Sequence, residues 1–165
     1  MYRKGIEIRQ HDITDCGAAC LASVCAHYGL QFSIAHIRQY AFTARKSTNV
    51  LGGVIEAANR LGLSAKGVKA LFEALRIVPK PTIAHVIVHE RLQHFVVIYK
   101  VKKEHITYMD PGDGRMHKVT NETFVSMWTG VLILMEPEES FKKGNMKTSM
   151  VRKFFSLLAP HRHYS

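Results

Sequence analysis

The sequence has no long hydrophobic run and few cysteines. No stretch of its 165 residues reaches the roughly 18 consecutive apolar residues that a membrane-spanning helix needs. The first five residues carry charges with no apolar segment behind them, so they do not predict a signal peptide. Three cysteines, an odd number, favour free thiols in a reducing compartment over a disulfide framework. The length predicts one domain with a core of its own.

Acidic residues are absent from the end of the chain. The formal net charge is +10, and residues 141–165 hold six Lys or Arg and no Asp or Glu. The rest of the chain therefore carries only +4. No motif of the common nucleic-acid-binding modules occurs, so we expect no nucleic-acid partner. Four apolar residues are interleaved with the basic residues of this tail, which is typical of a segment at a membrane surface. They are Phe154, Phe155, Leu157 and Leu158.

The usual metal and nucleotide motifs are also missing. The sequence has no Cys-x-x-Cys pair and no His-Glu-x-x-His run, and a zinc site would be expected to show one of them. His85 and His89, placed on one face of a predicted strand, are the weak alternative. A glycine-rich phosphate loop is absent as well. The domain is therefore predicted to bind no metal, no ATP and no other cofactor.

Helical patterns come first along the chain and strand patterns second. This order predicts an α+β fold with an antiparallel sheet, because alternating helices and strands would be needed for a parallel one. The composition changes at residue 138, which predicts a domain over 1–138 and a basic linker over 139–165. Helices are predicted over 15–27, 34–40, 50–61, 71–75 and 121–128, and strands over 64–69, 82–88, 94–101, 105–109, 116–119 and 130–135, with a turn over 111–114.

The first predicted helix begins with a cysteine. Asp15 is a residue type that favours the N-cap position, and a run of small and apolar residues follows it. Cys16 would then lie in the first turn, where free backbone N–H groups and the helix dipole favour a thiolate. A cysteine in this position can have its pKa lowered from about 8.5 to roughly 3.5–7.5. Cys16 is therefore the candidate nucleophile, whereas Cys20 and Cys25 are interpreted as small core residues.

A base and a group to orient it are predicted on the sheet. His94 opens a strongly apolar strand and Asp110 closes the next one. In an antiparallel pair with a tight turn over 102–104, these two ends lie side by side. Asp110 could then orient the His94 ring and stabilise its imidazolium form. Gln10, six residues before Cys16, could donate its side-chain amide to an oxyanion.

Each of these residues also has an ordinary structural interpretation. A cysteine in an alanine-rich helix is most often a core residue. A histidine at the start of a strand is commonly exposed, and Asp before Pro-Gly is a common turn residue. The combination therefore matters more than any one residue.

Taken together, the motifs resemble the papain-like double-glycine peptidase domain at the N-terminus of bacteriocin-exporting ABC transporters. The resemblance covers about residues 6–136. It rests on Gln10 with Asp-Cys-Gly-Ala-Ala at 15–19, Tyr-Gly at 28–29, His-Phe-Val-Val at 94–97, Asp-Pro at 110–111, and Phe124, Trp128 and Gly130. It implies a papain-like fold in which N-terminal helices carrying the cysteine pack on an antiparallel sheet carrying the His and Asp. It also implies roles by position. Cys16 would be the nucleophile, His94 the general acid and base, Asp110 its orienting group, and Gln10 the oxyanion-hole donor.

The same resemblance implies a substrate and partners. Such domains cut the leader from a peptide precursor after a Gly-Gly or Gly-Ala pair, through a cleft too narrow for larger side chains, while an amphipathic leader helix docks on a surface groove. Transmembrane helices and an ATPase domain would follow, with ATP and Mg²⁺ bound only there and a homodimer in the full-length protein. Residues 139–165 would be a linker and the start of an elbow helix at the membrane surface, on the cytoplasmic face of the bacterial inner membrane.

Two alternatives remain open at this point. Some transporters carry a non-catalytic docking version of this domain that lacks the cysteine, and the presence of Cys16, His94 and Asp110 argues against that reading. A papain-like enzyme with other chemistry, such as acyl transfer, is the second alternative. Leader specificity separates them, because a transferase should ignore a Gly-Gly leader.

Overall fold

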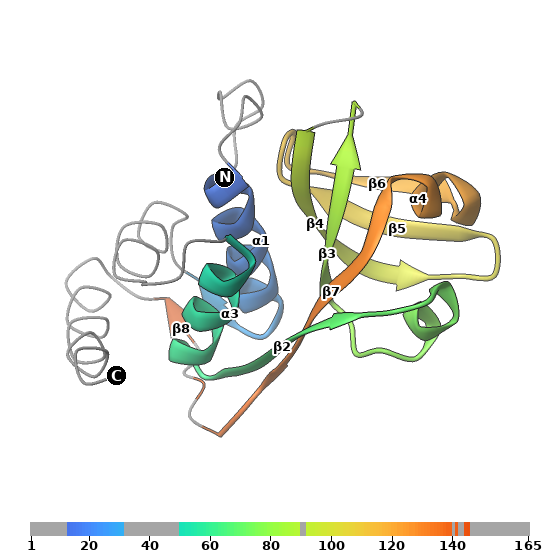
Figure 1. Ribbon diagram of the computed structural model, residues 1–165. Helices are drawn as coiled ribbons and strands as arrows, with labels where there is room; N and C mark the ends of the chain where they lie inside the picture. The colour runs from blue at the N-terminus through green and yellow to red at the C-terminus, as the bar shows by residue number, and fades with distance from the viewer. Residues whose placement is uncertain (1–12, 32–49, 90–91, 140, 142–143, 146–165) are drawn as a thin grey trace.

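The computed structural model describes residues 13–31, 50–89, 92–139, 141 and 144–145. Within these ranges, helices α1 and α3 precede a large antiparallel sheet, and the short helical segments η3 and α4 lie at the other side of that sheet (Figure 1). The α+β prediction is therefore confirmed. The helical elements are α1 (Ile13–His27), α3 (Val50–Arg60), the 3-10 helix η3 (Phe72–Arg76) and α4 (Asn121–Met127).

The main sheet has six strands in the order β2-β7-β3-β4-β5-β6, and every neighbouring pair is antiparallel. A second, two-stranded sheet pairs β1 with β8 in parallel. The strands are β1 (Leu30–Gln31), β2 (Leu63–Lys69), β3 (Thr82–Val88), β4 (Leu92–Val101), β5 (His105–Asp110), β6 (Arg115–Thr120), β7 (Trp128–Pro137) and β8 (Gly144–Asn145).

Both faces of the main sheet are covered, because alternate side chains along a strand point to opposite faces. On β4, Phe95 and Val97 belong to the core under α1 and α3. Val96 and Ile98 belong to a second core on the other face, which Phe124 of α4 helps to form. The sheet therefore separates an α1 side from an α4 side.

Helix α1 is buried along most of its length, because its sequence is small and apolar almost all round. Ala18, Cys20, Leu21 and Val24 have no exposed surface. No helix in the part of the chain that the structure describes is long and apolar enough to cross a membrane.

Several element boundaries differ from the sequence prediction. Helix α1 begins at Ile13, so Asp15 is its third residue and not its N-cap. The last strand begins at Trp128, two residues early, because α4 ends at Met127. The short strands β1 and β8 were not predicted. The predicted helix over 34–40 lies outside the described residues.

The boundary at residue 138 stays a prediction. Beyond it, Phe141 is buried in the core on the α1 side, and its ring lies 6.4 Å from that of Tyr28. The chain thus keeps contact with the end of α1 for at least a few residues past the last long strand.

Candidate active site

Cys16 lies near the N-terminal end of α1, against the start of β4. It is the fourth residue of the helix, and only 1% of its surface is exposed. Its Sγ lies 2.9 Å from Nδ1 of His94. The structure therefore brings the predicted nucleophile and the predicted base into hydrogen-bonding contact.

A second polar contact holds α1 on the same strand. The hydroxyl of Tyr99 on β4 lies 2.5 Å from Oγ of Ser23 and donates to the carbonyl of Ser23 at 3.3 Å. Cys16 and Ser23 are two helical turns apart and so share one face of α1. Helix and strand are thus joined at two points along their length.

Asp110 completes the arrangement from the neighbouring strand. The turn after β4 is closed by a hydrogen bond from the N–H of Lys102 to the carbonyl of His105. The register that follows, with Val97 opposite Met109, brings the end of β5 beside the start of β4. Oδ1 of Asp110 lies 2.7 Å from Nε2 of His94. The predicted proximity of these two ends is observed.

The Asp110 carboxyl is held in its ionised form. Burial acts to raise its pKa, but four effects together outweigh burial and lower the pKa below its ordinary value. These are the hydrogen bond and charge of His94, the backbone N–H of Gly112 and the charge of His117. An ionised carboxylate can only accept hydrogen bonds.

This charge state decides which nitrogen of the neutral His94 ring carries the proton. Nε2 must carry a proton to donate to Asp110, so in the neutral ring Nδ1 is an acceptor that faces Cys16. A proton moved from the thiol to Nδ1 gives a thiolate beside an imidazolium, and the Asp110 carboxylate stabilises the latter. His94 is only 5% exposed, so water competes little with these contacts.

The other two cysteines of α1 are in a different electrostatic environment. Burial, reinforced by negative charge on Cys16 and Asp110, raises the pKa of Cys20 well above its ordinary value. Burial alone raises the pKa of Cys25 to about 12. Both thiols therefore stay protonated, as expected of core residues.

One sequence-based assignment at the site stays untested, and another interpretation is wrong. Gln10 lies outside the described residues, so its oxyanion-hole role stays a prediction. His85 and His89 do not share a strand, because β3 ends at Val88 and His89 has a left-handed backbone with φ of 52°. The expectation that His85 and His89 share one face of a strand was wrong. The described residues contain no group of three or more His, Cys, Asp or Glu that could hold a metal.

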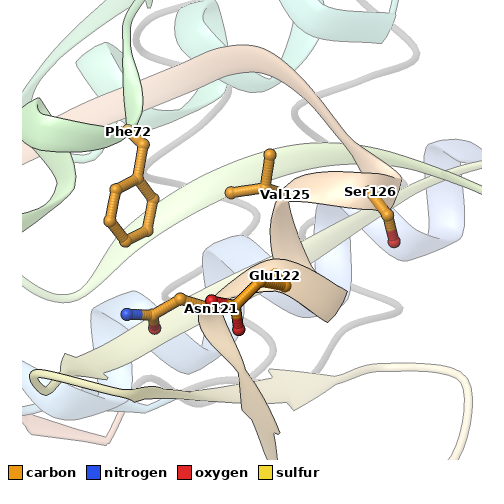
Figure 2. Close-up of a pocket in the computed structure, with 5 residues that line it drawn as sticks. All are labelled: Phe72, Asn121, Glu122, Val125 and Ser126. Carbon is orange, nitrogen blue, oxygen red and sulfur yellow. The ribbon is translucent and has the colours of Figure 1, made fainter.

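The sequence interpretation missed one contact and one surface. Gly112, assigned only to a turn, donates its N–H to Oδ1 of Asp110 at 2.7 Å. On the α4 side of the sheet, η3 and α4 form a shallow pocket of about 470 Å³ (Figure 2). Its lining consists of Phe72, Asn121, Glu122, Val125 and Ser126.

The geometry defines a class of protein. A buried thiol near a helix N-terminus, an imidazole on one strand and a carboxylate on the next, in that order along the chain, are arranged as in a papain-like cysteine peptidase. The model of the Peptidase C39 family matches residues 6–140. The chain belongs to this family, which is one of cysteine peptidases.

One curated relative shows the context in which such a domain occurs. The chain is 35% identical over 153 residues to the lactococcin-G-processing and transport ATP-binding protein LagD of Lactococcus lactis subsp. lactis. The match covers 92% of this chain and 22% of LagD. The chain thus spans about a fifth of the length of this relative.

Solved structures agree with the fold. The peptidase domain of Streptococcus ComA, a bifunctional ABC transporter involved in quorum sensing, is 36% identical with a TM-score of 0.68, and the match covers 84% of this chain and all of that one. A double-glycine-motif protease from an AMS/PCAT transporter, solved in complex with the leader peptide, is 32% identical with a TM-score of 0.64. That match covers 75% of this chain and 85% of the other.

Proposed function

We propose that this chain is a cysteine endopeptidase domain that cleaves the leader from a secreted peptide precursor after a Gly-Gly or Gly-Ala pair, coupled to export by an ABC transporter. The observation that carries the proposal is the continuous chain of contacts from Cys16 Sγ through the His94 ring to Asp110. This arrangement suits peptide-bond cleavage, because it supplies a nucleophile, a proton carrier and a group that orients that carrier.

Cys16, His94 and Asp110 are the proposed catalytic set, and the reaction has two halves. In the first, the Cys16 thiolate bonds to the carbonyl carbon of the second glycine. The peptide C–N bond then breaks, and the imidazolium of His94 gives its Nδ1 proton to the leaving amine. In the second, His94 takes a proton from water, whose oxygen displaces the sulfur and frees the leader. Gln10 is proposed to donate to the oxyanion in both halves.

The substrate assignment is supported by the known proteins that this chain resembles. LagD is named for lactococcin-G processing and transport, and the AMS/PCAT protease was solved with a leader peptide bound. A glycine requirement also has a physical reason, since a cleft closed around the scissile bond rejects larger residues by steric overlap. We expect no metal or other cofactor to take part in this domain.

The pocket on the α4 side is the proposed docking place for the apolar face of the leader helix. Phe72 and Val125 face each other across it (Figure 2). Val125, which lines the pocket, is 44% exposed. An amphipathic helix in an apolar groove would bury this surface.

The pocket and Cys16 lie on different sides of the sheet. The segment that joins the docked helix to the Gly-Gly pair would therefore run around the edge of the sheet. The docked helix would then contribute to the affinity for the substrate, and the glycines would determine where it is cut.

The remaining partners belong to the longer protein. We propose transmembrane and ATPase domains in the same chain, with ATP and Mg²⁺ bound in the latter, a homodimer, and a location on the cytoplasmic face of the bacterial inner membrane. Residues 139–165 are proposed as a linker and the start of a membrane-surface helix. The support is that LagD is a transport ATP-binding protein of which this chain matches 22%, and that the tail carries a basic excess.

A cleavage assay tests the proposed function. The substrate is a synthetic leader ending in Gly-Gly joined to a short cargo, and the products are measured by mass spectrometry. We expect a single cut after the second glycine, and none with Cys16→Ala. Binding of the leader by the wild type without cleavage would replace the proposal by a non-catalytic docking module. Neither binding nor cleavage would reject the substrate.

A further inference from the structure

The turn between β5 and β6 begins directly after Asp110 and is held from both sides. The carbonyl of Asp110 accepts from the N–H of Gly114 at 2.8 Å. On the far side, the carboxylate of Asp113 accepts from the N–H of Arg115 at 2.9 Å and contacts Nε2 of His117 at 2.9 Å. The turn backbone has little freedom to shift as a unit.

Gly112 lies against the proposed catalytic pair of His94 and Asp110. Its backbone N–H contacts Asp110, and a side chain at this position would approach both residues. Its N–H donates to Oδ1 of Asp110 at 2.7 Å, the same oxygen that faces Nε2 of His94 at 2.7 Å. A Cβ at position 112 would lie 3.1 Å from this oxygen and 3.8 Å from Nε2 of His94. Any side chain here would press on the carboxylate.

The backbone at position 112 does not itself require glycine. Gly114, in the same turn, has φ of 70°, in the left-handed region that disfavours other residues. Gly112 is not among the glycines with positive φ. Glycine is therefore needed at the two positions for different reasons. At position 114 the backbone conformation requires it, and at position 112 the absence of a side chain leaves room for the Asp110 carboxylate.

We propose that Gly112 is a positioning residue for the reaction, an inference that rests on the proposed roles of Cys16, His94 and Asp110. Its N–H fixes Oδ1 of Asp110, and its missing side chain lets that oxygen approach the His94 ring. An alanine at position 112 displaces Oδ1 of Asp110 by a few tenths of an ångström, because hydrogen bonds hold the backbone of the turn in place. The imidazolium then loses part of its stabilisation, and the thiolate of Cys16 becomes less populated near neutral pH.

The test compares Gly112→Ala with Gly114→Ala, two equal changes two residues apart. For Gly112→Ala we expect kcat on the Gly-Gly substrate to fall about tenfold, since small misplacements of reacting groups are costly, with KM within about twofold. The rate at which iodoacetamide alkylates Cys16, measured against pH, should show a higher apparent pKa than the wild type. For Gly114→Ala we expect a lower urea midpoint, because alanine is strained at positive φ, and an alkylation profile like that of the wild type.

Two results would overturn the proposal. One is a wild-type alkylation profile in a folded Gly112→Ala variant. The other is an equal shift of that profile in both variants, which would mean that any disturbance of the turn has this effect. Alkylation needs no peptide substrate, so a wild type that fails to cut the leader rejects the proposed function and still leaves the role of Gly112 to be decided.

Discussion

The two sides of the main sheet differ in how completely they are covered. On the α1 side, the contacts from Cys16 to His94 lie in a closed environment, with the thiol 1% and the imidazole 5% exposed. On the α4 side, η3 and α4 leave an open apolar pocket between Phe72 and Val125. Burial strengthens hydrogen bonds and charge effects, whereas an open apolar surface offers binding area. The comparison suggests chemistry on one side and recognition on the other.

The largest effect should come from Asp110, the carboxylate proposed to orient the imidazole. We expect Asp110→Asn to lower kcat on the order of 10³-fold, because a neutral amide stabilises imidazolium much less than a carboxylate does and can turn its NH2 group toward Nε2, which favours the wrong tautomer. Steady-state kinetics on the Gly-Gly substrate would measure it, with KM little changed. Glu104→Gln, at the other end of the same hairpin, is the matched control. A fall in kcat below tenfold would contradict the role of Asp110.

An intermediate effect should come from the pocket. We expect Val125→Asp to raise KM for the leader-bearing substrate about tenfold, since it places a charge in an apolar contact, with kcat retained. Val125→Thr, which keeps the shape of the side chain, should raise KM much less. If Val125→Asp instead lowered kcat and slowed alkylation of Cys16, the separation of the two sides would be wrong.

The smallest effect should be the contribution of Asp110 to stability. Its pKa is lowered in the folded protein, so its stabilising contribution is full above the ordinary aspartate pKa and is lost as the pH falls through the lower folded-state value. Urea unfolding of the wild type and Asp110→Asn between about pH 2 and pH 6 would show it as a difference that shrinks toward low pH. With 28% of the side chain exposed, solvent screens this contribution. A difference independent of pH would contradict the lowered pKa.

Much of the fold was predictable because the signals are local. The small and apolar run of α1 and the short apolar runs of β3 and β4 each depend on neighbouring residues alone. The proximity of His94 and Asp110 followed from one short hairpin turn. The family resemblance then connected these residues to a reaction.

The rest depends on contacts that local patterns do not encode. A Pro-Gly-Asp-Gly segment predicts a turn whether or not a carboxylate lies behind its second residue, so the contact of Gly112 could not be predicted. The pocket joins η3 to α4, which are separated by four strands in the sequence. His85 and His89 were placed together because strand alternation was extended one residue too far, past the left-handed backbone of His89.

The contact between Tyr99 and Ser23 has a mechanical consequence. A helix attached to a strand at a single point can still roll about its own axis, and a roll would swing the side chains of its inner face away from the strand. Two attachments on one face, Cys16 to His94 and Ser23 to Tyr99, remove that freedom. The direction in which the sulfur is aimed is thus set partly by a hydroxyl pair two helical turns from it.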